Sequence, residues 1–391
     1  MNTSDCMKNC YEYLRNNRPK NRWIFKLYQD FTLNRIFFMA DKTNRNTINS
    51  DLSLKFSQLN FLLSFLVVFI HSYTYYYNVN DAQWVFQKIV SDNIGRIAVP
   101  LFFSISGFFL FLKYENSWED YKELISKKMR SLVIPYFLWS LLSCILMFCI
   151  QLVYTDLNQE LMKNKTIFEN IKSFLTGEYT VLWFVRILFF MMLLTPVLKF
   201  IIDRKYLYIP VLMILFFLDF LDNNFSFFIL KSDSLLFFML GGVLSQNLSL
   251  FDKKINSAVL LIISVLFAGA NIYMDWGTTN HVNDVNIFER LFILSFSIFV
   301  WNCDAIYKFL NRIPAKNYHY AFTIYIFHAY IIVMIFKKIS SALIPLPAVA
   351  YLLTAFGTFF FCLLLSILLE KYLPFFFRIL SGDRKVRKTV K

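Results

Sequence analysis

Long uncharged apolar stretches recur along the sequence, and they constrain the fold more than any other feature. One of them runs from Phe56 to Tyr77. A stretch of about 18 or more apolar residues is long enough to cross a bilayer as a helix. The whole chain is 57% hydrophobic and 17% charged, whereas soluble domains are about 45–50% apolar and about 25% charged. The sequence therefore predicts an integral membrane protein.

About ten of these stretches are expected to be transmembrane helices, so the predicted fold class is all-α, a polytopic membrane helix bundle. The predicted limits are 56–77, 95–113, 131–154, 181–201, 206–222, 233–247, 257–274, 286–302, 318–336 and 348–369. This divides the chain into a cytoplasmic amino-terminal extension (1–55), a transmembrane domain (56–370) and a basic cytoplasmic tail (371–391).

The amino-terminal extension lacks the short apolar core of a cleavable signal peptide. Within it, apolar residues follow helical spacing at Ile24, Leu27, Tyr28 and Phe31. That spacing suits a basic amphipathic helix on the inner leaflet. An ordinary cytoplasmic extension explains it equally well.

The positive charge of the chain is distributed unevenly. The formal net charge is +14, and of the 40 lysines and arginines 28 fall in segments predicted to be cytoplasmic, 7 in external loops and 5 within or beside the helices. Cytoplasmic loops of membrane proteins carry this excess of basic residues. The charge therefore predicts that both termini are cytoplasmic, and it argues against nucleic acid as a partner. The basic tail is expected to contact anionic lipid.

The cysteines do not indicate a disulfide framework, because none of the six lies in a predicted external loop. Cys6 and Cys10 lie in the amino-terminal extension without a second pair of metal ligands, so we expect two reduced thiols. No cluster of carboxylates or thiols within the spans has the spacing of a metal site, and no metal is predicted.

Ionisable side chains inside a membrane span are costly, and each is a functional hypothesis. His71 lies 15 residues into the first span, roughly 22 Å along the helix. Burial would keep its imidazole neutral, which suits a general base acting on a hydroxyl. The alternative is a structural histidine bonded to a nearby carbonyl. His328 in the ninth span has the same two interpretations, and Tyr325 shares its helical face.

Arg96 begins the second span, where it could reach the lipid headgroups. However, Pro100 frees a backbone carbonyl in that helix, and Ser104, Ser106 and Gly107 make it small and polar. Such a helix is expected to pack against protein or a cavity.

Other cations have two possible roles as well. Arg186 lies near the outer end of the fourth span, and for Lys113, Lys199 and Arg290 at span ends we expect only contact with headgroups. Cations at a helix amino terminus also suit a phosphate-bearing cosubstrate. Three precede the third span: Lys127, Lys128 and Arg130. Positive-inside charge alone would also place them there.

Several strings together resemble the acyltransferase-3 family of bacterial integral membrane O-acyltransferases, over about residues 56–370. The most specific is Arg96–Gly107, which contains an Arg, a Val-Pro, paired Phe and a Ser-Gly. The others are Val67–His71, Ile134-Pro135-Tyr136 with Trp139, Leu182-Trp183-Phe184, Gly241-Gly242 and Tyr325–His328.

The resemblance implies a ten-helix bundle of the bacterial cytoplasmic membrane. It would move an acyl group, usually acetyl, from cytoplasmic acyl-CoA to a hydroxyl of a surface polysaccharide or its lipid-linked precursor. His71 would be the catalytic base or a transient acyl carrier, and Arg96 would help to build the site. Acetyl-CoA would be a cosubstrate, with no tightly bound cofactor. Residues expected to contact donor or acceptor are Asn60, Ser104, Ser106, Trp183, Arg186, Tyr325 and His328.

One position departs from the family pattern. The family usually has an arginine eleven residues before the first-helix histidine, and this chain has Asn60 there. Asparagine cannot hold a phosphate or carboxylate by charge, so Lys55 or another cation would have to replace that contact. Some relatives carry an extracytoplasmic hydrolase-like domain, and we expect acyl transfer here to be completed within the membrane bundle instead. A tunnel is needed as well, because the donor is cytosolic while His71 is predicted near the outer face.

Two other functions remain open. The same histidines and arginines could line the path of a carrier or exporter of a surface polysaccharide or lipid-linked saccharide. Asn60 would also suit an inactive relative that partners an assembly complex.

Overall fold

The computed structural model describes residues 48–73, 82–153, 165–177, 181–221, 226–227, 230–276, 286–328 and 331–382. The chain separates into two units, Met1–Ser50 and Asp51–Lys391, and the second unit is described here. The predicted amphipathic segment, Cys6 and Cys10 lie outside the described residues.

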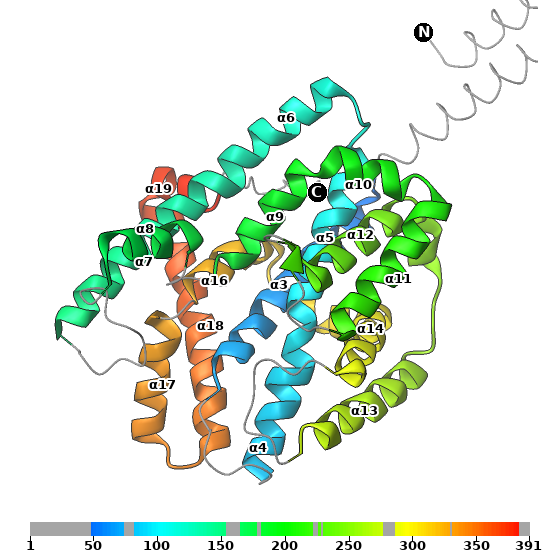
Figure 1. Cartoon of the computed structure of the whole chain (residues 1–391). Coiled ribbons are helices and arrows are strands. Elements are labelled where there is room, and N and C mark those ends of the chain that lie inside the picture. Colours follow the sequence, from blue (N-terminus) through cyan, green and yellow to red (C-terminus); the bar gives the residue numbers. More distant parts are fainter. Residues whose placement is uncertain are drawn as a thin grey trace, which may run out of the picture. The chain divides into compact units, whose positions relative to one another are not determined.

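Helices dominate the described part of the chain (Figure 1). Short π or 3₁₀ segments are labelled η. The first half contains α3 (Ser50–His71), α4 (Ala82–Gln87), η1 (Lys88–Ile94), η2 (Gly95–Ile97), α5 (Ala98–Lys113), α6 (Trp118–Lys128), η3 (Met129–Val133), α7 (Ile134–Val153), α8 (Ile167–Thr176), α9 (Trp183–Leu193), α10 (Thr195–Ile202) and α11 (Lys205–Leu221).

The second half begins with a two-stranded antiparallel hairpin of β1 (Ser226–Phe227) and β2 (Leu230–Lys231). The elements that follow are α12 (Ser232–Ser245), η5 (Leu248–Asp252), α13 (Ser257–Met274), α14 (Ile287–Asn302), α15 (Asp304–Leu310), η6 (Ala315–Tyr320), α16 (Ala321–Phe327), α17 (Ile331–Leu343), α18 (Pro347–Tyr372) and α19 (Pro374–Leu380).

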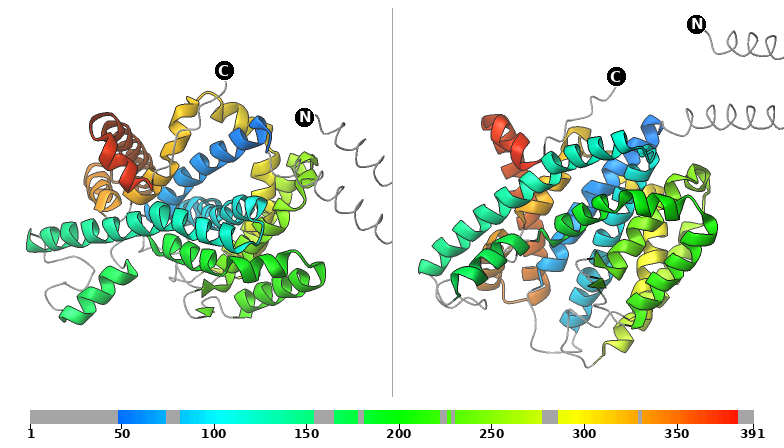
Figure 2. Two further views of the ribbon diagram at one scale, coloured as in Figure 1. Left: turned by 90° about the horizontal axis from the view of Figure 1, so that it is seen from above. Right: turned by 45° about the horizontal axis from the view of Figure 1, so that its top comes forward.

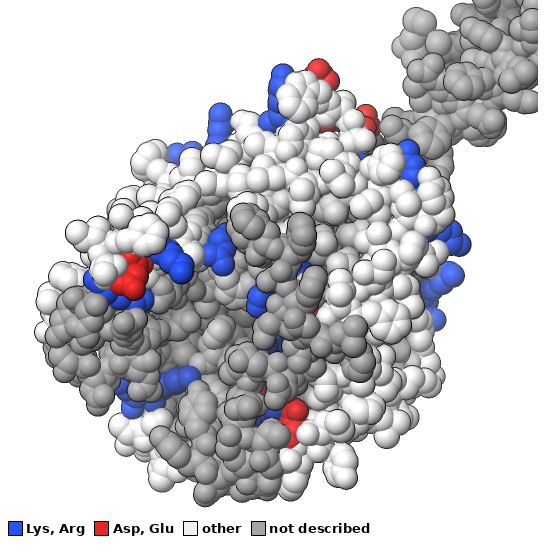
Figure 3. Space-filling view, viewed as in Figure 1, with Lys and Arg blue, Asp and Glu red and all other residues white. Residues whose placement is uncertain are grey.

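Several long apolar helices lack a protein cover, which is why the molecule needs lipid as a second solvent. The apolar window of α13 is only 17% buried within the molecule, whereas that of α3 is 56% buried. The face shown in Figure 3 is largely uncharged over its described atoms. Apolar helical surface of this extent is stable only against hydrocarbon. These features, together with the all-helical fold, confirm a membrane helical bundle.

Five continuous helical runs among the described residues are long and apolar enough to span a membrane. They are Ser50–His71, Ala82–Lys113, Trp118–Leu152, Ser257–Met274 and Pro347–Tyr372. Three bent pairs raise the number to 8 if each pair is one span. The remaining predicted spans correspond to the shorter helices α11 and α12. The count of ten and the location of the termini stay predictions.

Two predicted loops are helical instead. The second span was expected to begin at 95 after an external loop, but its helix begins at Ala82, and the third begins at Trp118 rather than 131. The segment from Ala82 to Ile94 was predicted to be a loop because it contains the charged residue Lys88. Its side chain is 3% exposed and its Nζ lies 2.8 Å from Asp275 and 3.6 Å from Asp92. Paired charges can be buried in a helix, and a hydropathy pattern does not reveal the pairing.

Two predicted spans, 181–201 and 318–336, bend sharply, and a third bend follows the span predicted at 286–302. The axis turns by 70° between α9 and α10, by 63° between α14 and α15, and by 82° between the η6–α16 segment and α17. The first bend has a local cause, because Pro196 stands in the first turn of α10 and has no amide hydrogen to continue the preceding helix. Bent backbone at membrane depth is tolerated where it faces protein or a cavity.

The closest helix packing joins α5 to α12. A Cβ added at Gly107 would lie 2.0 Å from the carbonyl oxygen of Phe238, and one added at Gly241 would lie 1.9 Å from that of Ser104. The hydroxyl of Ser104 also donates to the carbonyl of Phe237 at 3.0 Å. Small residues thus let the two backbones touch. This fixes α5 in the bundle, and Figure 2 shows α5 enclosed by α3, α6 and α12.

Candidate active site

His71 is the last residue of α3, and this helix end is held from two sides. The carbonyl of Phe69 accepts hydrogen bonds from the hydroxyl of Tyr351 at 3.2 Å and from that of Ser91 at 3.3 Å. The last carbonyls of a helix have no partner within the helix, so these bonds satisfy one of them. They also fix the position from which the imidazole of His71 projects.

The imidazole of His328 lies beside that of His71. The ring centroids are 5.3 Å apart and the ring planes are tilted by 42°. His328 is fully buried at the end of α16. Its Nδ1 lies 3.3 Å from the carbonyl of Ile324, so in the matching neutral tautomer Nδ1 carries the hydrogen and Nε2 is an acceptor. Among the described residues, Nε2 has no hydrogen-bond partner.

Arg96 adds a cation to this pair. It lies in η2, where the neighbouring Gly95 comes so close to α3 that an added Cβ would lie 2.9 Å from Ile70. The guanidinium acts electrostatically on His71 and on the buried carboxylate of Glu289. Pro100 cannot donate to the carbonyl four residues earlier, which belongs to Arg96. An imidazole from α3, a guanidinium from η2 and a carboxylate from α14 therefore act on one another in this part of the bundle.

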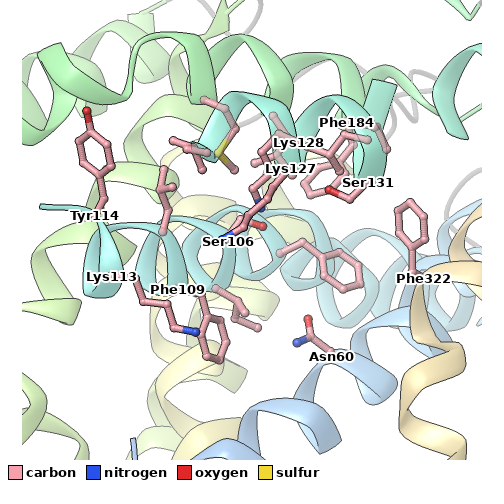
Figure 4. A pocket seen from close by; sticks show the side chains of 18 of the residues that line it. Asn60, Ser106, Phe109, Lys113, Tyr114, Lys127, Lys128, Ser131, Phe184 and Phe322 are labelled. Atoms are coloured by element: carbon pink, nitrogen blue, oxygen red, sulfur yellow. The ribbon is translucent and has the colours of Figure 1, made fainter. Parts of the chain in front are cut away.

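A cavity of about 520 Å³ is lined by Tyr325 but not by these groups (Figure 4). Its size falls in the range of small-molecule sites, about 300–1,000 Å³. Helix α5 lines it with residues spaced three or four apart, which form one face of the helix. These are Phe102, Ile105, Ser106, Phe109, Leu110 and Lys113.

The opposite wall of the cavity is also lined by residues spaced three or four apart along helices. The segment α6–η3 contributes Asp120, Glu123, Leu124, Lys127, Lys128, Ser131 and Leu132, and α9 contributes Phe184, Val185, Leu188 and Met192. The stripe on α5 runs from Phe102 to Lys113, a rise of about 16 Å along the helix. The cavity is therefore elongated along the bundle. Figure 4 shows Asn60 of α3 and Phe322 of α16 bordering it at one side.

One end of the cavity is charged. Lys113 and Asp120 lie there beside Tyr114, whereas Figure 4 shows Lys127 and Lys128 farther along the wall, toward Ser131 and Phe184. The Nζ of Lys127 is 2.5 Å from Glu123. Tyr114 lines the same end, where burial raises the pKa of its phenol above the usual value and keeps it a neutral hydrogen-bond donor. This end can therefore bind a polar, anionic group.

The other end of the cavity is aromatic and adjoins the histidines. Tyr325 lines the cavity, and its ring centroid is 5.8 Å from that of His328. Its hydroxyl donates to the carbonyl of Val181. The cavity thus runs from the charged end to within one side chain of the histidine pair. A path of this kind is what a cytosolic donor would require.

The predicted contact residues divide into two groups. Five line the cavity: Asn60, Ser106, Tyr325, Lys127 and Lys128. His328 does not line the cavity, but its ring centroid lies 5.8 Å from that of Tyr325. The others make different contacts.

Outside the cavity, Ser104 bonds to α12, and Arg186 donates to the carbonyl of Thr176 at 2.8 Å. The ring of Trp183 lies 5.1 Å from the Nζ of Lys231, and Arg130 is exposed.

Lys55 is not the substitute for the missing family arginine. Its Nζ lies 4.2 Å from the ring centroid of Trp301 and 4.6 Å from that of Tyr307, a cation–π arrangement. It does not line the cavity. The lysine from α5 that does is Lys113, for which only a headgroup contact was expected. Its position at the end of the Phe102–Lys113 stripe was the sequence signal that could have found it.

Arg290 was expected to reach the headgroups, and this prediction was wrong. Its side chain is 8% exposed and its Nε lies 2.5 Å from Asp219, whose side chain is 1% exposed. Asp233 lies 3.9 Å from the same guanidinium. A buried charge is retained when an opposite charge compensates it, and Asp219 lies too far away in the sequence to reveal the pair.

The described residues offer no group of three or more His, Cys, Asp or Glu side chains that could hold a metal ion. A family model described as an acyltransferase domain, of the acyltransferase-3 type, matches residues 57–369. The match covers most of the chain and both histidines. Neither the curated proteins nor the solved structures include a match.

Proposed function

This chain belongs to the acyltransferase-3 family, and from that premise we propose that it transfers an acyl group, namely acetyl, from cytoplasmic acyl-CoA to a hydroxyl of a surface polysaccharide or its lipid-linked precursor. The location would be the bacterial cytoplasmic membrane. Membrane lipid surrounds the bundle, and acyl-CoA acts as a cosubstrate.

The donor would enter at the charged end of the cavity. Lys113 would face the phosphates of CoA there, with Lys127 and Lys128 farther along the wall, and the neutral hydroxyl of Tyr114 would donate to the phosphates. The thioester arm would follow the apolar stripe of α5 inward. Asn60 borders this path and can donate through its amide. This arrangement brings the thioester toward Tyr325 and the histidines.

The chemical step is a direct transfer. The neutral imidazole of His71 takes the proton of the acceptor hydroxyl, and the oxygen attacks the thioester carbonyl carbon. The new C–O bond forms and the C–S bond breaks. The CoA thiolate leaves and takes up the proton. Arg96 would stabilise the negative charge that develops on the carbonyl oxygen. His328, with an acceptor Nε2, would orient His71 or the hydroxyl.

One observation carries this proposal. The histidine pair, with centroids 5.3 Å apart, adjoins Tyr325, and the same tyrosine lines a 520 Å³ cavity that reaches Lys113 and Lys128. A carrier would need a polar path across the bundle, whereas this cavity becomes aromatic before it reaches the histidines.

The test is thiol release from acetyl-CoA by the protein in reconstituted vesicles supplied with a lipid-linked saccharide acceptor. The wild type should consume thioester and acylate the acceptor. His71→Ala should lower kcat/KM by about 10²–10⁴-fold, the usual contribution of a positioned acid–base group.

His319→Asn is the matched control, because His319 does not line the cavity. Its Nε2 lies 3.2 Å from the carboxylate of Glu370. This variant should retain thiol release. If the wild type moves the saccharide across the membrane without consuming thioester, the protein is a carrier. If it does neither, it is an inactive relative, and the proposal fails.

A further inference from the structure

Three aromatic rings meet at the inner end of the cavity. The centroid of Phe102 lies 5.9 Å from that of Phe184 and 6.1 Å from that of Tyr325, and the last two are 5.8 Å apart. The rings come from α5, α9 and α16, and all three line the cavity. We name this group, Phe102, Phe184 and Tyr325, the aromatic triangle.

Two members of the aromatic triangle are anchored. The hydroxyl of Tyr325 donates to the carbonyl of Val181, and the ring of Phe184 packs 4.5 Å from that of Phe103. Both side chains are buried. Phe102 is only partly buried, so it is the member with the most space to adjust. The triangle is therefore a fixed wall with one adaptable side.

The aromatic triangle lies close to the residues proposed to carry out the reaction. Tyr325 lines the cavity and its ring centroid lies 5.8 Å from that of His328, and Phe102 follows Arg96 by six residues, about 9 Å along the helix. A thioester that enters from the charged end arrives with its acyl group foremost. The distal carbon of that acyl group would then be the first part of the donor to meet the rings.

We propose that the aromatic triangle sets the length of the acyl group that this protein transfers. This inference rests on the proposed acyl transfer. An acetyl group fits between the rings and the thioester position, and each further methylene must displace a ring. Selection is by size, because Phe102 and Phe184 offer no hydrogen bond. In an apolar pocket, one methylene changes the specificity ratio by about 10–200-fold.

The experiment compares acetyl-CoA with butyryl-CoA as donors for the reconstituted full-length protein. The wild type should favour acetyl-CoA. Phe102→Ala should raise the butyryl-to-acetyl ratio of kcat/KM by about tenfold or more. Phe109→Ala is the matched control, since Phe109 lines the same face of α5 two turns nearer to the charged end. It should leave that ratio within about twofold of the wild type.

Phe102→Leu is a second variant for the case that Phe102→Ala misfolds. It removes less volume and should give an intermediate butyryl-to-acetyl ratio of kcat/KM. An unchanged ratio in both Phe102 variants overturns the inference, as does an equal change in Phe109→Ala. In those cases acetyl transfer that is lost in His71→Ala would still support the proposed function. If the wild type consumes neither donor, the proposed function and the inference fail together.

Discussion

Arg290 and Asp219 form an ion pair in the interior of the bundle, with Nε 2.5 Å from one carboxylate oxygen and a terminal nitrogen 2.9 Å from the other. The two residues belong to α14 and α11. The terminal nitrogen donates a hydrogen bond to the carboxylate, and the Nε contact adds charge attraction without hydrogen-bond geometry. The pair therefore connects two helices at a point that apolar packing alone would not specify.

Breaking this pair should be costly. Arg290→Ala would leave the Asp219 carboxylate buried without its main partner, and we expect a loss of about 3–5 kcal/mol in the free energy of unfolding. The control is Lys127→Ala, which removes an exposed partner of Glu123 and should cost about 0–1 kcal/mol. Thermal unfolding in detergent checks both. Equal losses would show that the buried pair is not a structural link.

The contact between α5 and α12 predicts a second stability effect. At Gly107 an added methyl group would lie 2.0 Å from a backbone oxygen, so Gly107→Ala must separate the two helices. Overpacking of this kind costs about 1–3 kcal/mol. Gly269→Ala is the control, since an added Cβ there has nothing within 4 Å, and alanine is the better helix former by up to about 1 kcal/mol. A lower unfolding temperature for Gly269→Ala than for Gly107→Ala would contradict the packing described.

Substitution of Asn60 should change the affinity for the acyl-CoA donor. Asn60→Arg would place a guanidinium in the cavity, where the family usually has one, and we expect the KM for acetyl-CoA to fall about tenfold through charge-assisted hydrogen bonds. Asn60→Ala should raise that KM, because it removes the amide. Steady-state kinetics of both variants provide the measurement. If arginine and alanine raise KM equally, Asn60 does not face the donor.

The predicted orientation can be tested by cysteine labelling in a background without the native cysteines. Lys172 in α8 and Glu119 in α6 are both exposed, and they lie in segments predicted to be outside and inside. In intact cells an impermeant maleimide should label Lys172→Cys and spare Glu119→Cys. The reverse pattern would place the charged end of the cavity outside the cell and exclude a cytosolic donor.

Hydropathy located the helices approximately, since each predicted span contains helix, although the first was predicted to run to 77 and α3 ends at His71. Ser257–Met274 has the predicted limits, because polar residues flank an uninterrupted apolar stretch. The extension from Ala82 could not be found in this way, because Lys88 and Asp92 make it look solvated. Their burial depends on Asp275, which only the folded chain brings near.

The candidate active site could be predicted in part, because polar residues are conspicuous in apolar sequence. His71, His328 and Tyr325 stand out as polar groups in apolar spans, and the structure brings the three together. Ser104 and Ser106 look equivalent in sequence. Only the packing of α12 distinguishes them, because it occupies Ser104 and leaves Ser106 in the cavity.

This difference gives the most direct test of the claim that the cavity receives the thioester donor. Ser106→Cys and Ser104→Cys, in a background without the native cysteines, would be incubated with bromoacetyl-CoA and analysed by mass spectrometry. Alkylation at position 106, suppressed by excess acetyl-CoA and much slower at position 104, is the predicted result. Equal rates at both positions, or no protection by acetyl-CoA, would contradict the account.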